Sequence, residues 1–223
     1  MAIMKETELF ACMKEKLYTG VICDTLDELG YRNQAMRENI RPLYPIVTES
    51  FVGRAKTILS VDVYYVPEQP YEMEIKAIDS IKPNEVLVAG TNKSVNNGLW
   101  GELLSTAAKM RGANGAIIDG LVRDTKKIGE LGFPVYCAGI KPVDSRGRGL
   151  VVDFDCPVEV GGVMVYPGDV IFADCDGVAV IPAIVFEQVV SNALAKVERE
   201  NFTRKELLEG SLLRDVYDKY GVL

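Results

Sequence analysis

Residues 98–124, GLWGELLSTAAKMRGANGAIIDGLVRD, contain the side chains whose types and spacing suggest chemistry. The pattern predicts a helix followed by a short apolar strand at 116–119. Glu102 lies in the first turn of that helix, and Arg123 and Asp124 follow the strand directly. In α/β proteins the carboxyl ends of strands are where catalytic side chains collect. An acid at a helix start and an Arg-Asp pair at a strand end are therefore candidates for one site.

Each of these groups suits a different part of the chemistry of a small oxo-acid. Arginine holds a carboxylate or an enolate oxygen with a permanently charged fork. Aspartate binds a magnesium-like ion directly or through its waters. Gly98 and Gly101 allow close approach of a ligand to a helix start, whose amides favour an anion. The plainer interpretation is a surface ion pair and a glutamate that compensates the helix dipole, and the residues alone leave both open.

The absence of histidine narrows the chemistry further. It excludes Ser-His-Asp and Cys-His catalysis, histidine-bound zinc and the commonest general base near neutral pH. Catalysis would depend on carboxylates, Lys, Tyr, Arg or water on a hard metal. Mg²⁺, which prefers oxygen ligands, fits this inventory, and Mn²⁺ is the alternative.

The length of 223 residues favours one compact domain, with two small ones possible. The pattern along the chain favours a single α/β domain over residues 1–223, with helical N-terminal and C-terminal segments. The chain is 48% hydrophobic and carries a net charge of -7, which argues against nucleic-acid binding. No stretch suggests a signal peptide or a membrane span, so a cytoplasmic protein is expected. The five cysteines form no CxxC pair, and each is expected to be a small buried hydrophobic residue in a reducing compartment.

Alternating patterns in the middle third predict an α/β core with parallel strands. The expected helices cover residues 5–17, 19–29, 71–81, 99–111, 125–131, 183–199 and 203–220. The expected strands lie at residues 51–66, 85–89, 116–119 and 135–138, with further β-runs between 158 and 182. Thr19 is the expected cap of the second helix. Tyr64 and Tyr65 are expected to pack on a strand, and the aspartates of 169–176 to form turns rather than bind metal.

The order of these motifs resembles the family that contains 4-hydroxy-4-methyl-2-oxoglutarate aldolase and regulator of ribonuclease activity A. Aldolases of that family carry an acidic residue, a twenty-residue spacer and Arg-Asp, which Glu102, Leu103–Val122 and Arg123-Asp124 reproduce. The resemblance covers most of the chain from about residue 19 to 182. Further matches are Asp24-Thr25-Leu26, Gly132-Phe133-Pro134-Val135, Gly161-Gly162-Val163, Pro167-Gly168-Asp169 and Asp174-Cys175-Asp176-Gly177-Val178. A family segment that often carries a histidine reads YEMEIKAID here, at residues 71–79.

The resemblance implies an RraA-like α-β-β-α sandwich, similar to swivelling phosphohistidine domains, assembled as a homotrimer or a dimer of trimers. Gly101, Glu102, Leu103 and Leu104 would form the substrate-binding turn, with amides facing a pyruvyl carboxylate. Arg123 would hold the pyruvyl group. Asp124 would anchor the metal, with Glu102 helping through its water shell. The family's sites lie at subunit interfaces, so Glu198 or Glu200 of a partner is a candidate further acid.

The implied activity is a divalent-metal-dependent lyase that cleaves a 4-hydroxy-2-oxo acid to pyruvate and also decarboxylates oxaloacetate. The alternative is a non-enzymatic regulator that binds a ribonuclease, which the family also includes. A lysine Schiff-base aldolase is conceivable, but no lysine lies in a recognisable motif. The RGRG run at 146–149 lacks the strand–GxGxxG–helix context of a nucleotide site.

Overall fold

The computed structural model describes residues 5–44 and 49–222. In these ranges the α-helices are α1 (Glu6–Lys16), α2 (Thr19–Glu28), α3 (Glu72–Asp79), α4 (Glu102–Met110), α5 (Thr125–Leu131), α6 (Phe186–Leu208) and α7 (Leu213–Tyr220). A short 3-10 turn, η1 (Ala183–Val185), leads into α6. The strands are β1 (Arg41–Pro42), β2 (Phe51–Asp62), β3 (Glu85–Gly90), β4 (Gly98–Trp100), β5 (Gly115–Val122), β6 (Val135–Ile140), β7 (Gly149–Phe154), β8 (Val158–Val160), β9 (Val163–Val165), β10 (Val170–Asp174) and β11 (Gly177–Ile181).

Most of the strands belong to one mixed sheet, with the order β1-β6-β5-β3-β2-β10-β11. Strand β4 pairs with β5, and β7 pairs with β2. The neighbours β2, β3, β5 and β6 run parallel, as the alternating pattern predicts, whereas β10 and β11 pair antiparallel. Strand β2 joins the parallel strands to the antiparallel pair β10-β11, because its first residues pair with β10. The last residues of β2 pair with β7. The hairpin β8-β9 forms a separate small sheet.

Both faces of the central strands are buried, which explains their near-continuous apolar runs. In β3, Val86 and Val88 face an inner cluster that includes residues of β8, β9, β10 and β11. Leu87 and Ala89, on the other face, belong to the cluster that includes residues of α3, α4 and α5. Parallel strands covered on both sides by apolar layers are stable only inside such a sandwich.

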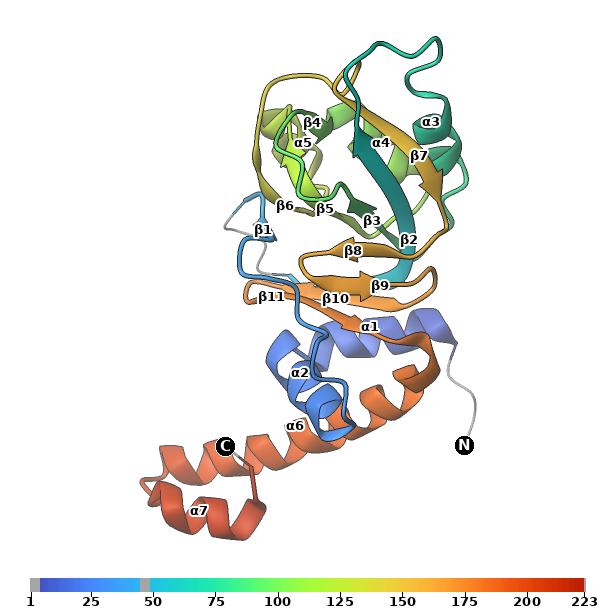
Figure 1. The fold of residues 1–223 in the computed structure, drawn as a ribbon. Coiled ribbons are helices and arrows are strands. Elements are labelled where there is room, and N and C mark those ends of the chain that lie inside the picture. Colours follow the sequence, from blue (N-terminus) through green and yellow to red (C-terminus); the bar gives the residue numbers. More distant parts are fainter. Residues whose placement is uncertain (1–4, 45–48, 223) are drawn as a thin grey trace.

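A third cluster covers the opposite outer face of the molecule. There α1, α2 and α6 pack on the outward side chains of β10 and β11, such as Phe172 and Ile181. Figure 1 shows these helices on one side of the strands and α3, α4 and α5 around the other. The layers therefore run helix, strand, strand, helix, and the α-β-β-α arrangement expected from the resemblance is confirmed.

The C-terminal helices differ from the prediction. Instead of separate pieces at 183–199 and 203–220, α6 is continuous for 23 residues and α7 packs against its end. The helix continues because no Gly or Pro occurs between Pro182 and Gly210, and Gly210 has a positive φ of 91°. Figure 1 shows the C-terminal end of α6, together with α7, projecting away from the strands. Among the residues described, no helix is both long enough and apolar enough to cross a bilayer.

Two sequence predictions about side-chain burial were wrong. Tyr64 and Tyr65 do not pack on a strand: they are 91% and 63% exposed. Strand β2 ends at Asp62, where its pairing with β7 ends, so the tyrosines extend past the sheet edge. Of the five cysteines, Cys137 is buried, Cys175 is exposed and the other three are half-buried.

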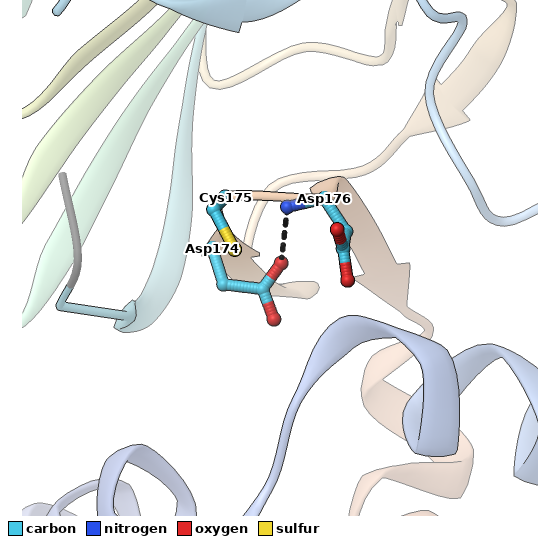
Figure 2. Close-up of side chains that lie close together, drawn as sticks. All are labelled: Asp174, Cys175 and Asp176. Atoms are coloured by element: carbon cyan, nitrogen blue, oxygen red, sulfur yellow. Dashed lines mark hydrogen bonds between the residues drawn. The ribbon is translucent and has the colours of Figure 1, made fainter. Parts of the chain in front are cut away.

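The turn between β10 and β11 anchors the start of α2. Asp174 accepts hydrogen bonds from the backbone N–H and the hydroxyl of Thr19, both at 2.7 Å. It also accepts one from the N–H of Asp176 at 3.0 Å, which Figure 2 shows. Thr19 is thus the first helical residue rather than the cap, and the helix start is satisfied by an acid distant in sequence. Asp169 likewise accepts from the N–H groups of Tyr166 and Ala183, both at 2.9 Å. These aspartates act as turn formers, as the sequence predicts.

We expect Asp174→Ala to lower the free energy of unfolding by about 2–4 kcal/mol, because it leaves buried donors at the α2 start without an acceptor. Urea denaturation followed by circular dichroism measures this loss. The matched control is Asp176→Ala, which removes an exposed carboxylate from the same turn. Equal stability of the two variants would contradict the anchoring role.

Candidate active site

Strand β4 connects the two segments that carry the predicted site residues. The sequence predicts a helix from residue 99, but residues 98–100 pair in parallel with β5, so α4 begins only at Glu102. The backbone N–H of Arg123 donates to the Trp100 carbonyl at 2.8 Å. The start of α4 is therefore fixed beside the end of β5.

The structure brings Glu102, Arg123 and Asp124 together. The Glu102 backbone N–H donates to Asp124 Oδ2 at 3.4 Å, and Arg123 Nε lies 3.8 Å from the same oxygen. Asp124 has a left-handed backbone, with φ of 57°, and makes no side-chain cap bond to α5. Its carboxylate faces α4 instead. The Glu102 carboxylate accepts from the Thr106 hydroxyl at 3.0 Å, so Glu102 meets Asp124 through its backbone.

Gly101 makes this close approach possible. A Cβ at this position would lie 2.7 Å from Asp124 Oδ2 and 3.2 Å from Arg123 Cγ, so a larger residue would push the charged pair away. The first amides of α4 have no acceptor within the helix. Leu103 is 76% exposed and Leu104 packs against the core. The role of residues 101–104 as a substrate-binding turn stays a prediction.

Arg123 also contacts an acid that the sequence analysis missed. Its Nη2 lies 3.1 Å from Asp144 Oδ1, and the Tyr71 hydroxyl donates to the other Asp144 oxygen. Burial acts to raise the pKa of Asp144, but the Tyr71 hydroxyl, the Arg123 charge and the amides of Ser145 and Arg146 outweigh it and lower that pKa. Arg123 therefore lies between two carboxylates, Asp124 and Asp144.

A second missed acid, Glu74, lies behind this pair. It is 8% exposed on α3, and burial together with the charge of Asp144 raises its pKa to about 7, against the opposing effect of Arg123. Tyr71 directly precedes α3, three residues before Glu74, and its pKa is raised mainly by its hydrogen bond to Asp144. Sheet order is the signal that could have identified Asp144: β5 and β6 are parallel neighbours, so the loops after them meet. An acid in the apolar pattern of α3 was the only sequence sign of Glu74.

A pocket of about 400 Å³ opens beside the pair. Its lining includes Arg123 and Asp124, whose side chains are 36% and 44% exposed, with Lys126, Lys127 and Ile140 around them. A larger pocket, of about 880 Å³, contains none of the predicted site residues, although it shares Thr125 and Lys126 with the smaller one. The chemistry of the lining favours the smaller pocket as the site for a charged ligand.

Asp124 is a residue that could hold a divalent cation. Its carboxylate is half-exposed and lies above the space that Gly101 leaves without a Cβ. Oxygen donors of this kind suit a hard cation such as Mg²⁺. Another acidic group, Asp174, Cys175 and Asp176, has potential ligand atoms within 4.8 Å of one another (Figure 2). The Asp174 oxygens already accept three hydrogen bonds there, so that group serves the turn.

The candidate partner acids lie on α6. Glu200 accepts a hydrogen bond from the Tyr18 hydroxyl of the same chain, and burial followed by this bond raises the pKa of Tyr18 to about 12. Figure 1 shows α6 on the opposite side of the strands from α4 and α5. Delivery of Glu198 or Glu200 to a neighbouring subunit stays a prediction.

Fold and sequence together define the class of protein. The mixed α/β sandwich has a nearly closed sheet, and the model of the RraA-like family (Aldolase/RraA) matches residues 19–180. The chain belongs to the RraA-like family.

Its relatives carry different names. Over 194 residues it is 30% identical to a Halalkalibacterium halodurans protein named "Putative 4-hydroxy-4-methyl-2-oxoglutarate aldolase", covering 86% of each chain. It is also 30% identical over 203 residues to the protein DlpA of Legionella pneumophila, covering 89% of this chain but only 32% of that longer protein. The crystal structure of Streptomyces coelicolor RraAS2, described as an unusual member of the RNase ES inhibitor RraA protein family, superposes with a TM-score of 0.81. That match has 27% identity and covers 91% of this chain and 100% of RraAS2.

The raised pKa of Glu74 predicts a pH-dependent stability. Its folded value of about 7 exceeds its ordinary 4.5, so between these values the folded state binds more protons than the unfolded state. The stabilising contribution of Glu74 is fully present below its ordinary pKa of 4.5 and is lost as pH rises through its folded pKa of about 7. We expect wild type to lose on the order of 2 kcal/mol relative to Glu74→Gln between about pH 5 and pH 8.

Urea unfolding of both proteins across this range measures the difference. The control is Glu72→Gln, the same substitution on the solvent side of α3, where Glu72 pairs with Lys76 at 2.9 Å. A constant difference between wild type and Glu74→Gln at every pH would show that Glu74 does not titrate near neutrality.

Proposed function

We propose that this protein is a divalent-metal-dependent lyase that cleaves a 4-hydroxy-2-oxo acid by a retro-aldol reaction to pyruvate, and that it also decarboxylates oxaloacetate. One observation carries the proposal: a helix start and a strand end meet, so that the Glu102 backbone and Gly101 lie against Asp124, and Arg123 and Asp124 line one pocket. The aldolase name of the Halalkalibacterium halodurans relative supports this activity.

Both reactions require stabilisation of the enolate of pyruvate. Asp124 would hold the cation, Mg²⁺ or Mn²⁺, with Glu102 acting through its water shell. When bound, the cation supplies Lewis acidity to the 2-oxo group and the neighbouring carboxylate. The free amides at the start of α4 would bind the substrate carboxylate, because a helix N-terminus favours an anion.

Arg123 would stabilise the charge that develops on the 2-oxo oxygen. Asp144 and Asp124 hold its guanidinium from two sides, at 3.1 Å and 3.8 Å. Such fixing orients the donor before the reaction, which is the condition for effective stabilisation of an oxyanion. The assembly that we propose is a homotrimer or a dimer of trimers, in which Glu198 or Glu200 of a neighbour supplies a further acid.

A second candidate function is a protein-binding regulator of ribonuclease activity. The likeness to RraAS2, a member of the RNase ES inhibitor family, favours it, and the net charge of -7 suits a protein partner rather than RNA. A pull-down with a ribonuclease E-type enzyme, run beside a pyruvate-release assay on the same preparation, separates the two functions. Partner capture without pyruvate release would favour the regulator.

We expect Arg123→Ala and Asp124→Ala each to lower the rate of pyruvate release by on the order of 100- to 1000-fold. The assay couples pyruvate to lactate dehydrogenase, with oxaloacetate and several 4-hydroxy-2-oxo acids as substrates, in Mg²⁺, Mn²⁺ or chelator. Arg111→Ala and Asp79→Ala are matched controls. These two residues form an exposed ion pair, with 2.7 Å between Arg111 Nη2 and Asp79 Oδ1, and neither lines the pocket. A variant of Arg123 or Asp124 that retains wild-type activity would remove that residue from the mechanism.

A further inference from the structure

Tyr71, Glu74 and Asp144 form an acidic layer beside Arg123, and the proposed reaction uses only Asp144 of the three, to hold the guanidinium. Tyr71 directly precedes α3, and Glu74 lies three residues later, in the first turn of the helix. The Tyr71 hydroxyl donates to Asp144, and Asp144 pairs with Arg123 at 3.1 Å. Glu74 is nearly as buried as a core residue, with 8% exposure, yet no hydrogen bond to its carboxylate occurs among the described residues.

This layer limits how much of the Arg123 charge is available to a ligand. The guanidinium already faces Asp144 and Asp124, and its Nε is buried without a hydrogen-bond partner in the described part of the chain. A buried unpartnered donor on a charged group is costly unless a ligand completes it. An ionised Glu74 adds another negative charge that acts on the guanidinium, since the two charges influence each other, and burial weakens the screening of that charge.

We propose that Glu74 is a positioning residue whose proton controls the affinity of Arg123 for the substrate carboxylate. With Glu74 protonated, the charge of Arg123 is offset by fewer acids, and an incoming anion meets less repulsion. With Glu74 ionised, the site repels the anion. The inference rests on the proposed function, because it takes an anionic oxo-acid as the ligand.

The groups that face Glu74 determine the direction of the pH effect. Asp144 and Arg123 are the charges that act on it, the first raising and the second lowering its pKa, and burial raises it most, to about 7. Arg146 lies near Tyr71 and lowers the pKa of that hydroxyl. A bound anion adds negative charge and so raises the pKa of Glu74 further. Binding therefore takes up a proton, and affinity falls as pH rises through neutrality.

The first test is the pH dependence of KM for oxaloacetate at saturating Mg²⁺. If only the protonated form binds, the apparent KM of wild type rises about tenfold between about pH 6 and pH 8, because the competent fraction falls by that factor. The KM of Glu74→Gln should change less than about twofold over the same range, since its amide does not titrate. Glu72→Gln, on the exposed side of the same helix, should keep the wild-type profile.

The second test measures the proton itself. Calorimetric titration with oxalate and Mg²⁺ near pH 7, in two buffers of different ionisation enthalpy, reports the protons taken up on binding. Wild type and Glu72→Gln should take up a fraction of a proton, and Glu74→Gln should take up none. Should Glu74→Gln fail to fold, Glu74→Met replaces it, because it keeps the length of the side chain without the charge.

The outcomes separate this inference from the proposed function. A wild type that releases pyruvate, with the same KM profile and proton uptake in Glu74→Gln, would overturn the role of Glu74 alone. A pH-independent loss of kcat in Glu74→Gln with the wild-type KM profile retained would also overturn it, because a structural defect explains that result. A wild type that neither releases pyruvate nor binds oxalate would sink both proposals together.

Discussion

The site depends on a short pairing between two strands. Residues Gly98–Trp100 run parallel to the end of β5, and the Trp100 carbonyl accepts the Arg123 N–H at 2.8 Å. Without this pairing the start of α4 and the end of β5 would have no fixed relation, although twenty residues separate them in sequence. The pairing itself is held by the core, because the Trp100 side chain is buried and donates to the Ser105 hydroxyl at 2.7 Å. Hydrophobic packing thus positions charged groups that could not position themselves.

Next to this pairing, the backbone at Asp124 and Gly101 departs from regular structure and places a charged side chain. Asp124 adopts a left-handed conformation, which a non-glycine residue tolerates only where its surroundings hold it. Its carboxylate is thereby turned from the helix that it precedes towards Gly101, where no Cβ intervenes. The strain at Asp124 and the space at Gly101 are two parts of one arrangement. Together they expose a carboxylate at the surface beside a guanidinium that is partly buried.

Local alternation predicted the α/β core with parallel strands, and the family resemblance implied the sandwich layers. The sequence also predicted that the start of α4 meets Arg123 and Asp124, although Glu102 does so through its backbone while its carboxylate bonds Thr106. It misplaced the start of α4, since three residues of β4 are too short to read as a strand without their partner. It missed Asp144, which reaches Arg123 only because β5 and β6 are neighbours, a fact of sheet order. It wrongly predicted that Tyr64 and Tyr65 pack on a strand, because β-propensity does not show where a sheet ends. Each error arises where a long-range contact overrides a local preference.

A chain without histidine still has a way to place a titrating group near neutral pH. Burial disfavours the charged form of a carboxylate, and a nearby carboxylate adds to the effect. Glu74 has both features: its side chain is almost fully covered, and Asp144 is held ionised by Tyr71 and Arg123. Burial therefore raises the pKa of Glu74 most, the ionised Asp144 raises it further, and Arg123 opposes both. Because Asp144 pairs with Arg123 directly and its charge acts on Glu74, a proton gained or lost at Glu74 would be felt at the guanidinium, which is the coupling that we propose.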